Sequence, residues 1–109
     1  MPNKAINIKV DDEGVPYVPA CMHNVGKAVW KITWRLHSDY EPDYMLVDIT
    51  GLPGPTFTGL TPAPDTIVLS DDNKGKGKHP KIYVYEIVVE KRSNRQRTLG
   101  KAIIRNDPG

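Results

Sequence analysis

The chain has 109 residues and a net charge of only +2, with 15 Lys and Arg against 13 Asp and Glu. This length suits one compact domain with its own hydrophobic core, so we expect residues 1–109 to form a single domain. Ten prolines and nine glycines argue against long helices, no apolar run approaches the ~20 residues that cross a bilayer, and one cysteine excludes an internal disulfide.

The N-terminal segment contains two short candidate strands. Residues 5–10 (AINIKV) and 15–18 (VPYV) are apolar enough for strands, and the acidic stretch DDEG separates them. DDEG has neither the length nor the ligand spacing of a calcium loop, so we interpret it as a hairpin turn. The first 14 residues lack the apolar stretch of a signal peptide, and we therefore expect a cytoplasmic protein.

Residues 20–24, ACMHN, place three side chains that soft metals prefer next to one another. In an extended chain Cys21 and His23 point to one face and Met22 to the other, so at most two of them contact one metal. A zinc site would need two further ligands. We therefore interpret Cys21 and Met22 as ordinary core residues, with His23 at a strand end. Metal binding by Cys21 and His23 is the alternative.

The clearest strand is predicted over residues 27–37, KAVWKITWRLH. Apolar and polar residues alternate along it, which is typical of a strand buried on one face. The predicted inner face consists of Ala28, Trp30, Ile32, Trp34 and Leu36.

The middle of the chain combines turns with weaker strands. HSDY at residues 37–40 holds the residue types of a hydrolase triad, but consecutive residues cannot form its line of hydrogen bonds, and a turn is expected instead. A strand is expected at 44–49 (YMLVDI). Residues 51–64 carry four prolines that cannot donate to a strand ladder. We expect them to cross between two sheets, with a short edge piece at 56–59.

Residues 66–70 (TIVLS) are the next expected strand, and a polar, glycine-rich turn, SDDNKGKGKHP, follows it. Gly77 and Lys78 match part of a phosphate-binding loop, but the first glycine and the final Ser or Thr of that motif are missing. The basic residues of this turn are Lys74, Lys76 and Lys78. We interpret it as a hairpin tip.

The second strong strand is predicted over residues 81–90, KIYVYEIVVE. Its β-branched and aromatic residues favour a strand, and apolar residues on both faces indicate a central place in a sheet. One face carries Tyr83, Tyr85, Ile87 and Val89. A hairpin loop with a basic tip then leads to a last strand at 99–106 (LGKAIIRN).

About seven short strands separated by turns predict an all-β fold, a single-domain antiparallel β-sandwich. A small closed barrel is the alternative, because periodicity does not separate the two. We expect the core between the sheets to contain Trp30, Ile32, Trp34, Tyr83 or Tyr85, and Ile87.

The order AVWKITWRL, a proline-rich middle, IYVYEIVV and AIIRNDP resembles small cupredoxin-like or immunoglobulin-like sandwich domains with Greek-key connections. The resemblance implies a fold and no activity. In cupredoxins a type 1 copper site takes its Cys, its second His and usually a Met from around the loop that joins the last two strands. Here that loop, EKRSNRQRTLGK, contains none of the three, so the resemblance implies a sandwich without a copper site.

Charge is distributed unevenly along the chain. Residues 74–105 carry ten Lys and Arg against two Glu, whereas residues 1–73 carry five basic and ten acidic residues. This asymmetry favours oriented self-association or an acidic partner. The candidates for polyanion contact are Lys91, Arg92, Arg95 and Arg97. No aromatic residues interleave with them for base stacking, and the two basic loops are expected at opposite ends of the 81–90 strand.

Neither a nucleophile–base pair nor paired carboxylates can be proposed from the spacing of the residues. We therefore expect a non-enzymatic binding or structural module without a cofactor, which associates with a protein partner or with itself. Two alternatives stay open. One is nucleic-acid or polyanion binding through the 91–97 loop, and the other is metal binding through Cys21 and His23.

Overall fold

The computed structural model describes residues 2–20, 22–73 and 79–108, and over these residues it contains nine strands and no helix. The strands are β1 (Asn3–Val10), β2 (Pro16–Tyr17), β3 (His23–Val25), β4 (Val29–Leu36), β5 (Tyr44–Thr50), β6 (Phe57–Pro62), β7 (Thr66–Asp72), β8 (Lys81–Lys91) and β9 (Arg97–Asn106). None of these residues belongs to a helix that could cross a membrane.

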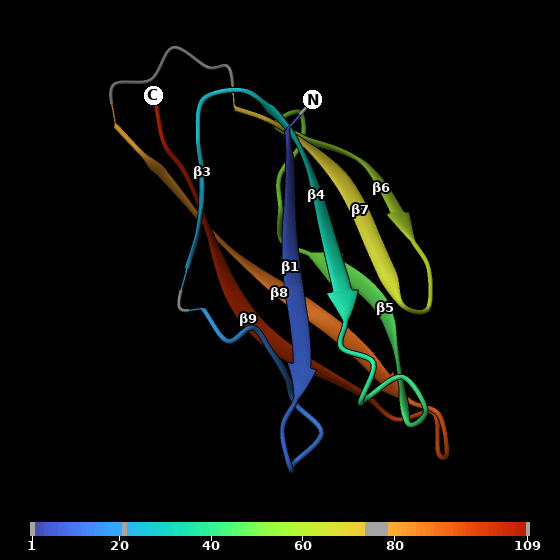
Figure 1. Cartoon of the computed structure of the whole chain (residues 1–109). Helices are drawn as coiled ribbons and strands as arrows, with labels where there is room; N and C mark the ends of the chain where they lie inside the picture. Colours follow the sequence, from blue (N-terminus) through green and yellow to red (C-terminus); the bar gives the residue numbers. More distant parts are fainter. Residues whose placement is uncertain (1, 21, 74–78, 109) are drawn as a thin grey trace.

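The strands form two sheets. A five-stranded sheet has the order β2-β1-β4-β7-β6, and a four-stranded sheet has the order β3-β9-β8-β5. Figure 1 shows the sheets stacked as two layers, with the strands of one crossing those of the other. The chain is therefore an all-β sandwich, as the alternating sequence pattern predicts.

Two details differ from the expected antiparallel sandwich of about seven strands. The described residues form nine strands, because residues 23–25 form the short β3 and the proline-containing segment, expected to give a short edge piece at 56–59, forms the six-residue edge strand β6. Both sheets are also mixed, because β1 pairs with β4 and β3 pairs with β9 in parallel. Parallel neighbours need a long crossover. The chain provides one between β1 and β4 by passing through β3 in the other sheet.

Trp34 and Tyr85 meet at the centre of the core. Both are fully buried, their rings are arranged edge to face with centroids 5.5 Å apart, and Trp34 Nε1 donates a hydrogen bond to the Tyr85 hydroxyl at 3.0 Å. Ile32 and Ile87 are also buried, which confirms the predicted inner faces. Trp30 is only partly buried, because it is the second residue of β4 and lies at the edge of the core. There its Nε1 donates a hydrogen bond to the Gly26 carbonyl at 2.9 Å.

The predicted connections are largely confirmed. β8 has β9 on one side and β5 on the other, so it occupies the central place that its two apolar faces indicated. A hairpin joins β8 to β9, and residues 51–56 cross from β5 in one sheet to β6 in the other. The polar turn begins later than expected, because residues 70–72 belong to β7.

This longer β7 carries a carboxyl group into the sandwich. Asp71 is fully buried, and Asn106 of the facing sheet donates from Nδ2 to its Oδ1 at 2.8 Å. Asp71 Oδ2 and Asn106 Oδ1 are buried without a hydrogen-bond partner in the described part of the chain. Burial raises the pKa of Asp71 to about 6, the hydrogen bond from Asn106 opposes this rise, and the charge of Asp72 adds to it.

Candidate protein-binding surface

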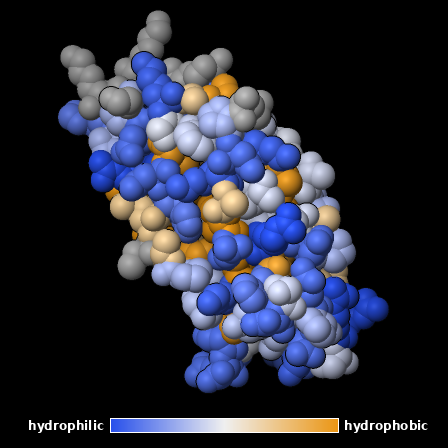
Figure 2. Space-filling view, in the orientation of Figure 1, coloured by the Kyte–Doolittle hydropathy of each residue, from blue (hydrophilic) through white to orange (hydrophobic). Residues whose placement is uncertain are grey.

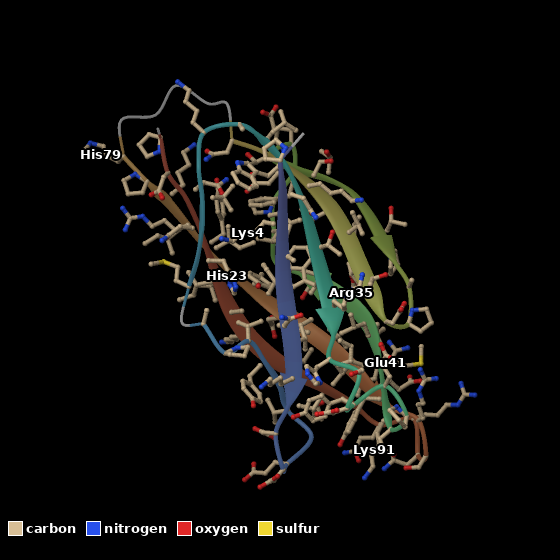
Figure 3. The ribbon with its side chains drawn as sticks, in the orientation of Figure 1. Lys4, His23, Arg35, Glu41, His79 and Lys91 are labelled. Atoms are coloured by element: carbon tan, nitrogen blue, oxygen red, sulfur yellow. The ribbon has the colours of Figure 1, made fainter. Side chains whose placement is uncertain are left out.

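His23 begins β3, as predicted for a strand end, and it is half-buried. Its Nδ1 is buried without a hydrogen-bond partner among the described residues. Burial and then the charge of Lys4 lower the pKa of His23, and Figure 3 shows Lys4 on the neighbouring β1. Cys21 lies outside the described residues. No group of three His, Cys, Asp or Glu side chains arranged for a metal occurs in the part of the chain that the structure describes.

The basic 91–97 loop begins at one end of β8. Figure 3 shows His79 near one end of the molecule and Lys91 near the other, with the eleven-residue β8 between them. Lys74, Lys76 and Lys78 lie outside the described residues, and so does the prediction that their loop and the 91–97 loop form no single basic patch.

Two of the four candidates for polyanion contact already bind other parts of the chain. Arg92 Nε donates to the carbonyl oxygens of Glu41 and Tyr44 at 3.0 and 3.2 Å. Arg97 forms an ion pair with Glu90 at 3.2 Å across the β8–β9 hairpin. Lys91 and Arg95 are exposed.

The acidic DDEG turn lies beside the basic hairpin. Asp12 and Glu13 line the same cleft of about 160 Å³ as Lys91. Thr98 at the start of β9 also donates a hydrogen bond to the Gly14 carbonyl. The positive potential of the hairpin is therefore partly offset by carboxylates next to it, which weakens its attraction for a polyanion.

The Arg92 contacts predict a structural role for this side chain. We expect Arg92→Gln to lower the free energy of unfolding by about 1–2 kcal/mol, because it removes charge-assisted hydrogen bonds that tie the β4–β5 loop to the hairpin. Arg95→Gln, in the same loop, is the matched control and should change it by less than about 0.5 kcal/mol. Urea titration of the two variants measures the difference. Equal stability of both would contradict the structural role of Arg92.

A different surface stands out on the outside of the four-stranded sheet. Side chains alternate along a strand, so the residues of β8 and β9 between the buried ones point away from the core. We call this surface the β8–β9 face. It consists of Ile82, Val84, Glu86, Val88 and Glu90 of β8 and Arg97, Leu99, Lys101, Ile103 and Arg105 of β9.

Large apolar side chains of the β8–β9 face are open to solvent. Ile82, Val84 and Leu99 are 60%, 55% and 56% exposed. Ile82, Val84 and Ile103 form one apolar cluster, Val88 and Leu99 form a second, and the Glu86–Lys101 pair lies between the two clusters. Exposed apolar clusters bordered by charged residues are typical of protein interaction sites.

The charges of this face are sorted by strand. Its acidic residues, Glu86 and Glu90, are on β8, and its basic residues are all on β9. Glu90 is buried and pairs with Arg97, so Glu86 is the acidic residue that this face leaves accessible. Glu86 pairs in register with Lys101, yet their charged groups form no ion pair within the described chain. Apolar and charged register pairs therefore alternate from Val84 to Glu90, whereas Ile82 pairs with Arg105. The central charged pair, Glu86 and Lys101, is open to an outside partner.

The outside of the five-stranded sheet differs in character. On β4 it presents Lys31, Thr33 and Arg35, and on β7 it presents Thr66 and Ser70, with Val68 between them. Figure 2 views the molecule from this side, and hydrophilic side chains predominate there. An antiparallel-rich sheet with one polar, solvated face is ordinary for a soluble sandwich. The β8–β9 face is the exception.

The sequence pattern of β8 contained a signal for this surface. Apolar residues occur on both faces of the 81–90 segment, and the second apolar row indicates a central strand. The strand is central, but its outer row is not covered by a further layer of the described chain. No protein-family model matches the chain, and a search of curated proteins finds no relative.

Proposed function

We propose that this chain is a non-enzymatic β-sandwich module that binds a protein partner through the β8–β9 face. The observation that carries the proposal is the exposure of three large apolar side chains, Ile82, Val84 and Leu99, on the outside of two adjacent strands. Burying such side chains is favourable by about 1.5–3 kcal/mol each. A sandwich of the immunoglobulin-like or cupredoxin-like kind, as the sequence resemblance implies, would serve as a rigid support for this surface.

Site-specific cross-linking in the cells that make the protein tests the proposal. A photo-reactive amino acid replaces Val84 in one variant and Thr33, on the outside of the five-stranded sheet, in a matched control. We expect a cross-linked product of one defined mass from position 84 and none from position 33. Adding Leu99→Lys should remove the product, because it places a charge among the apolar side chains.

Three results would overturn the proposal. They are no product from position 84, equal products from both positions, or a product from position 84 that Leu99→Lys leaves unchanged. Polyanion binding through Lys91, Arg92, Arg95 and Arg97 predicts a different outcome, namely binding that weakens steeply with salt and is lost when the three arginines become glutamine.

A further inference from the structure

We infer that the partner of the β8–β9 face is a second copy of this chain, packed face to face about a two-fold axis. The axis runs parallel to the strands, between β8 and β9. This inference rests on the proposed function, because it names the occupant of the same surface. A two-fold interface uses the same patch on both copies, so the patch must be complementary to itself.

The sorting of charge by strand meets this requirement. A two-fold axis between β8 and β9 places β8 of one copy over β9 of the other and leaves each residue at the same height along the strands. Glu86, which pairs in register with Lys101, then lies opposite Lys101 of the second copy. The same operation repeats the contact on the other side of the axis, so two ion pairs form between the copies.

Four of the five apolar residues of the face match under the same operation, whereas Ile82 comes to lie over Arg105 of the second copy. Val84 comes to lie over Ile103 of the second copy, and Val88 comes to lie over Leu99, because these residues are register partners within one chain. Apolar pairs therefore meet apolar pairs on both sides of the central charged pair. Sheets packed face to face keep their strands within about 30° of each other, which preserves these contacts near the centre.

Another face-to-face arrangement fails on charge. A two-fold axis perpendicular to the strands and through the central pair places β8 over β8, so Glu86 of one copy meets Glu86 of the other. It likewise places the basic row over the basic row. Juxtaposed like charges disfavour an interface strongly. Of the two arrangements, only the axis parallel to the strands is compatible with the charges of the face.

The size of the surface limits the affinity. The four strands of this sheet have 3, 10, 11 and 7 residues. At ~3.3 Å per residue and ~4.8 Å between strands they cover roughly 500 Å² on each copy, so the total is about 1,000 Å², in the range of weak, transient interfaces. We therefore expect a dimer of low affinity.

Charge exchange between two variants tests the arrangement. Glu86→Lys and Lys101→Glu each place like charges opposite each other in a dimer of identical copies, and each should weaken dimerisation by about 100-fold. The first variant has lysine at both positions and the second has glutamate at both. In an equal mixture, both contacts between unlike copies therefore join opposite charges, and the mixed dimer should form.

If the mixture dimerises again, the effect comes from contacts between the copies. The like charges at positions 86 and 101 within each chain are the same in the mixture as in the separate variants. Sedimentation velocity of the purified proteins measures the two variants and their mixture beside the wild type, with circular dichroism as the folding control.

The outcomes separate this inference from the proposed function. A monomeric wild-type protein, or a mixture of the two variants that stays monomeric, overturns the dimer. A cross-link from position 84 to a different polypeptide then still supports a protein-binding face, whereas the absence of any cross-link overturns both.

Leu99→Lys, at an exposed position, is a second variant that should give a folded monomer and should not be rescued by mixing. A dimer that tolerates Leu99→Lys uses another surface and contradicts the inference.

Discussion

Replacing Asp71 by asparagine is expected to stabilise the protein at pH 7 by as much as about 3 kcal/mol. The pKa of Asp71 rises from 3.8 in the unfolded chain to about 6 in the fold because the carboxyl group is buried. About two pH units at 1.36 kcal/mol each correspond to about 3 kcal/mol. Above pH 6 the carboxylate is charged in both states, and the folded state bears the cost of burying it.

The sign of the pH dependence follows from the direction of this change. Between about pH 4 and pH 6 the folded protein keeps the proton on Asp71 while the unfolded chain has lost it. The contribution of Asp71 to stability is therefore greatest below about pH 4 and decreases as the pH rises to about 6. When Asp71 is protonated on Oδ2, this oxygen can donate a hydrogen bond to Asn106 Oδ1, which otherwise has no partner among the described residues. An asparagine at position 71 offers an amide donor there at every pH.

Urea denaturation followed by tryptophan fluorescence checks this expectation. The stability difference between Asp71→Asn and the wild type should be large at pH 7 and should shrink towards zero at pH 4. Asp65→Asn, at an exposed position before β7, is the matched control and should show little difference at either pH. An Asp71→Asn variant that is less stable than the wild type at pH 7 would contradict the buried-charge explanation.

Replacing Trp34 by alanine is expected to lower the free energy of unfolding by about 3–5 kcal/mol. The indole ring is fully buried and packs edge to face on Tyr85, which belongs to the facing sheet. Its removal leaves a cavity where the two sheets meet. It also leaves the Tyr85 hydroxyl without its hydrogen bond from Nε1.

Trp30→Ala is the matched control for this prediction, because Trp30 lies on the same strand and face but is only partly buried. It should destabilise the protein clearly less than Trp34→Ala in the same urea titration. Tyr85→Phe should have a smaller effect, about 1–2 kcal/mol, because it removes the hydroxyl and keeps the ring. A Trp34→Ala protein within about 1 kcal/mol of the wild type would show that Trp34 is not at the centre of the core.

Several residues escaped prediction because their surroundings come from distant parts of the chain. Asp71 stands in a polar stretch that is typical of a turn, yet β7 continues through it and directs it towards Asn106, 35 residues away. Arg92 and Arg97 belong to a segment whose sequence is typical of a solvated basic loop. In the structure Arg92 donates to the carbonyl oxygens of Glu41 and Tyr44, and Arg97 forms an ion pair with Glu90. A sequence pattern describes a residue's own strand and says little about what lies opposite it.

The sequence by itself determined the all-β class, the inner faces of β4 and β8 and the β8–β9 hairpin. It also placed the crossover within residues 51–64, of which 51–56 cross between the sheets and 57–62 form β6. These follow from local physics, since alternation of side chains and the missing donors of proline act within a few residues. Only the tertiary structure decided the parallel pairing of β1 with β4 and of β3 with β9, the burial of Asp71, and the exposure of the outer apolar row of β8. Strand direction and burial depend on which segments become neighbours, and an alternating pattern is the same for either direction and for a covered or an uncovered face.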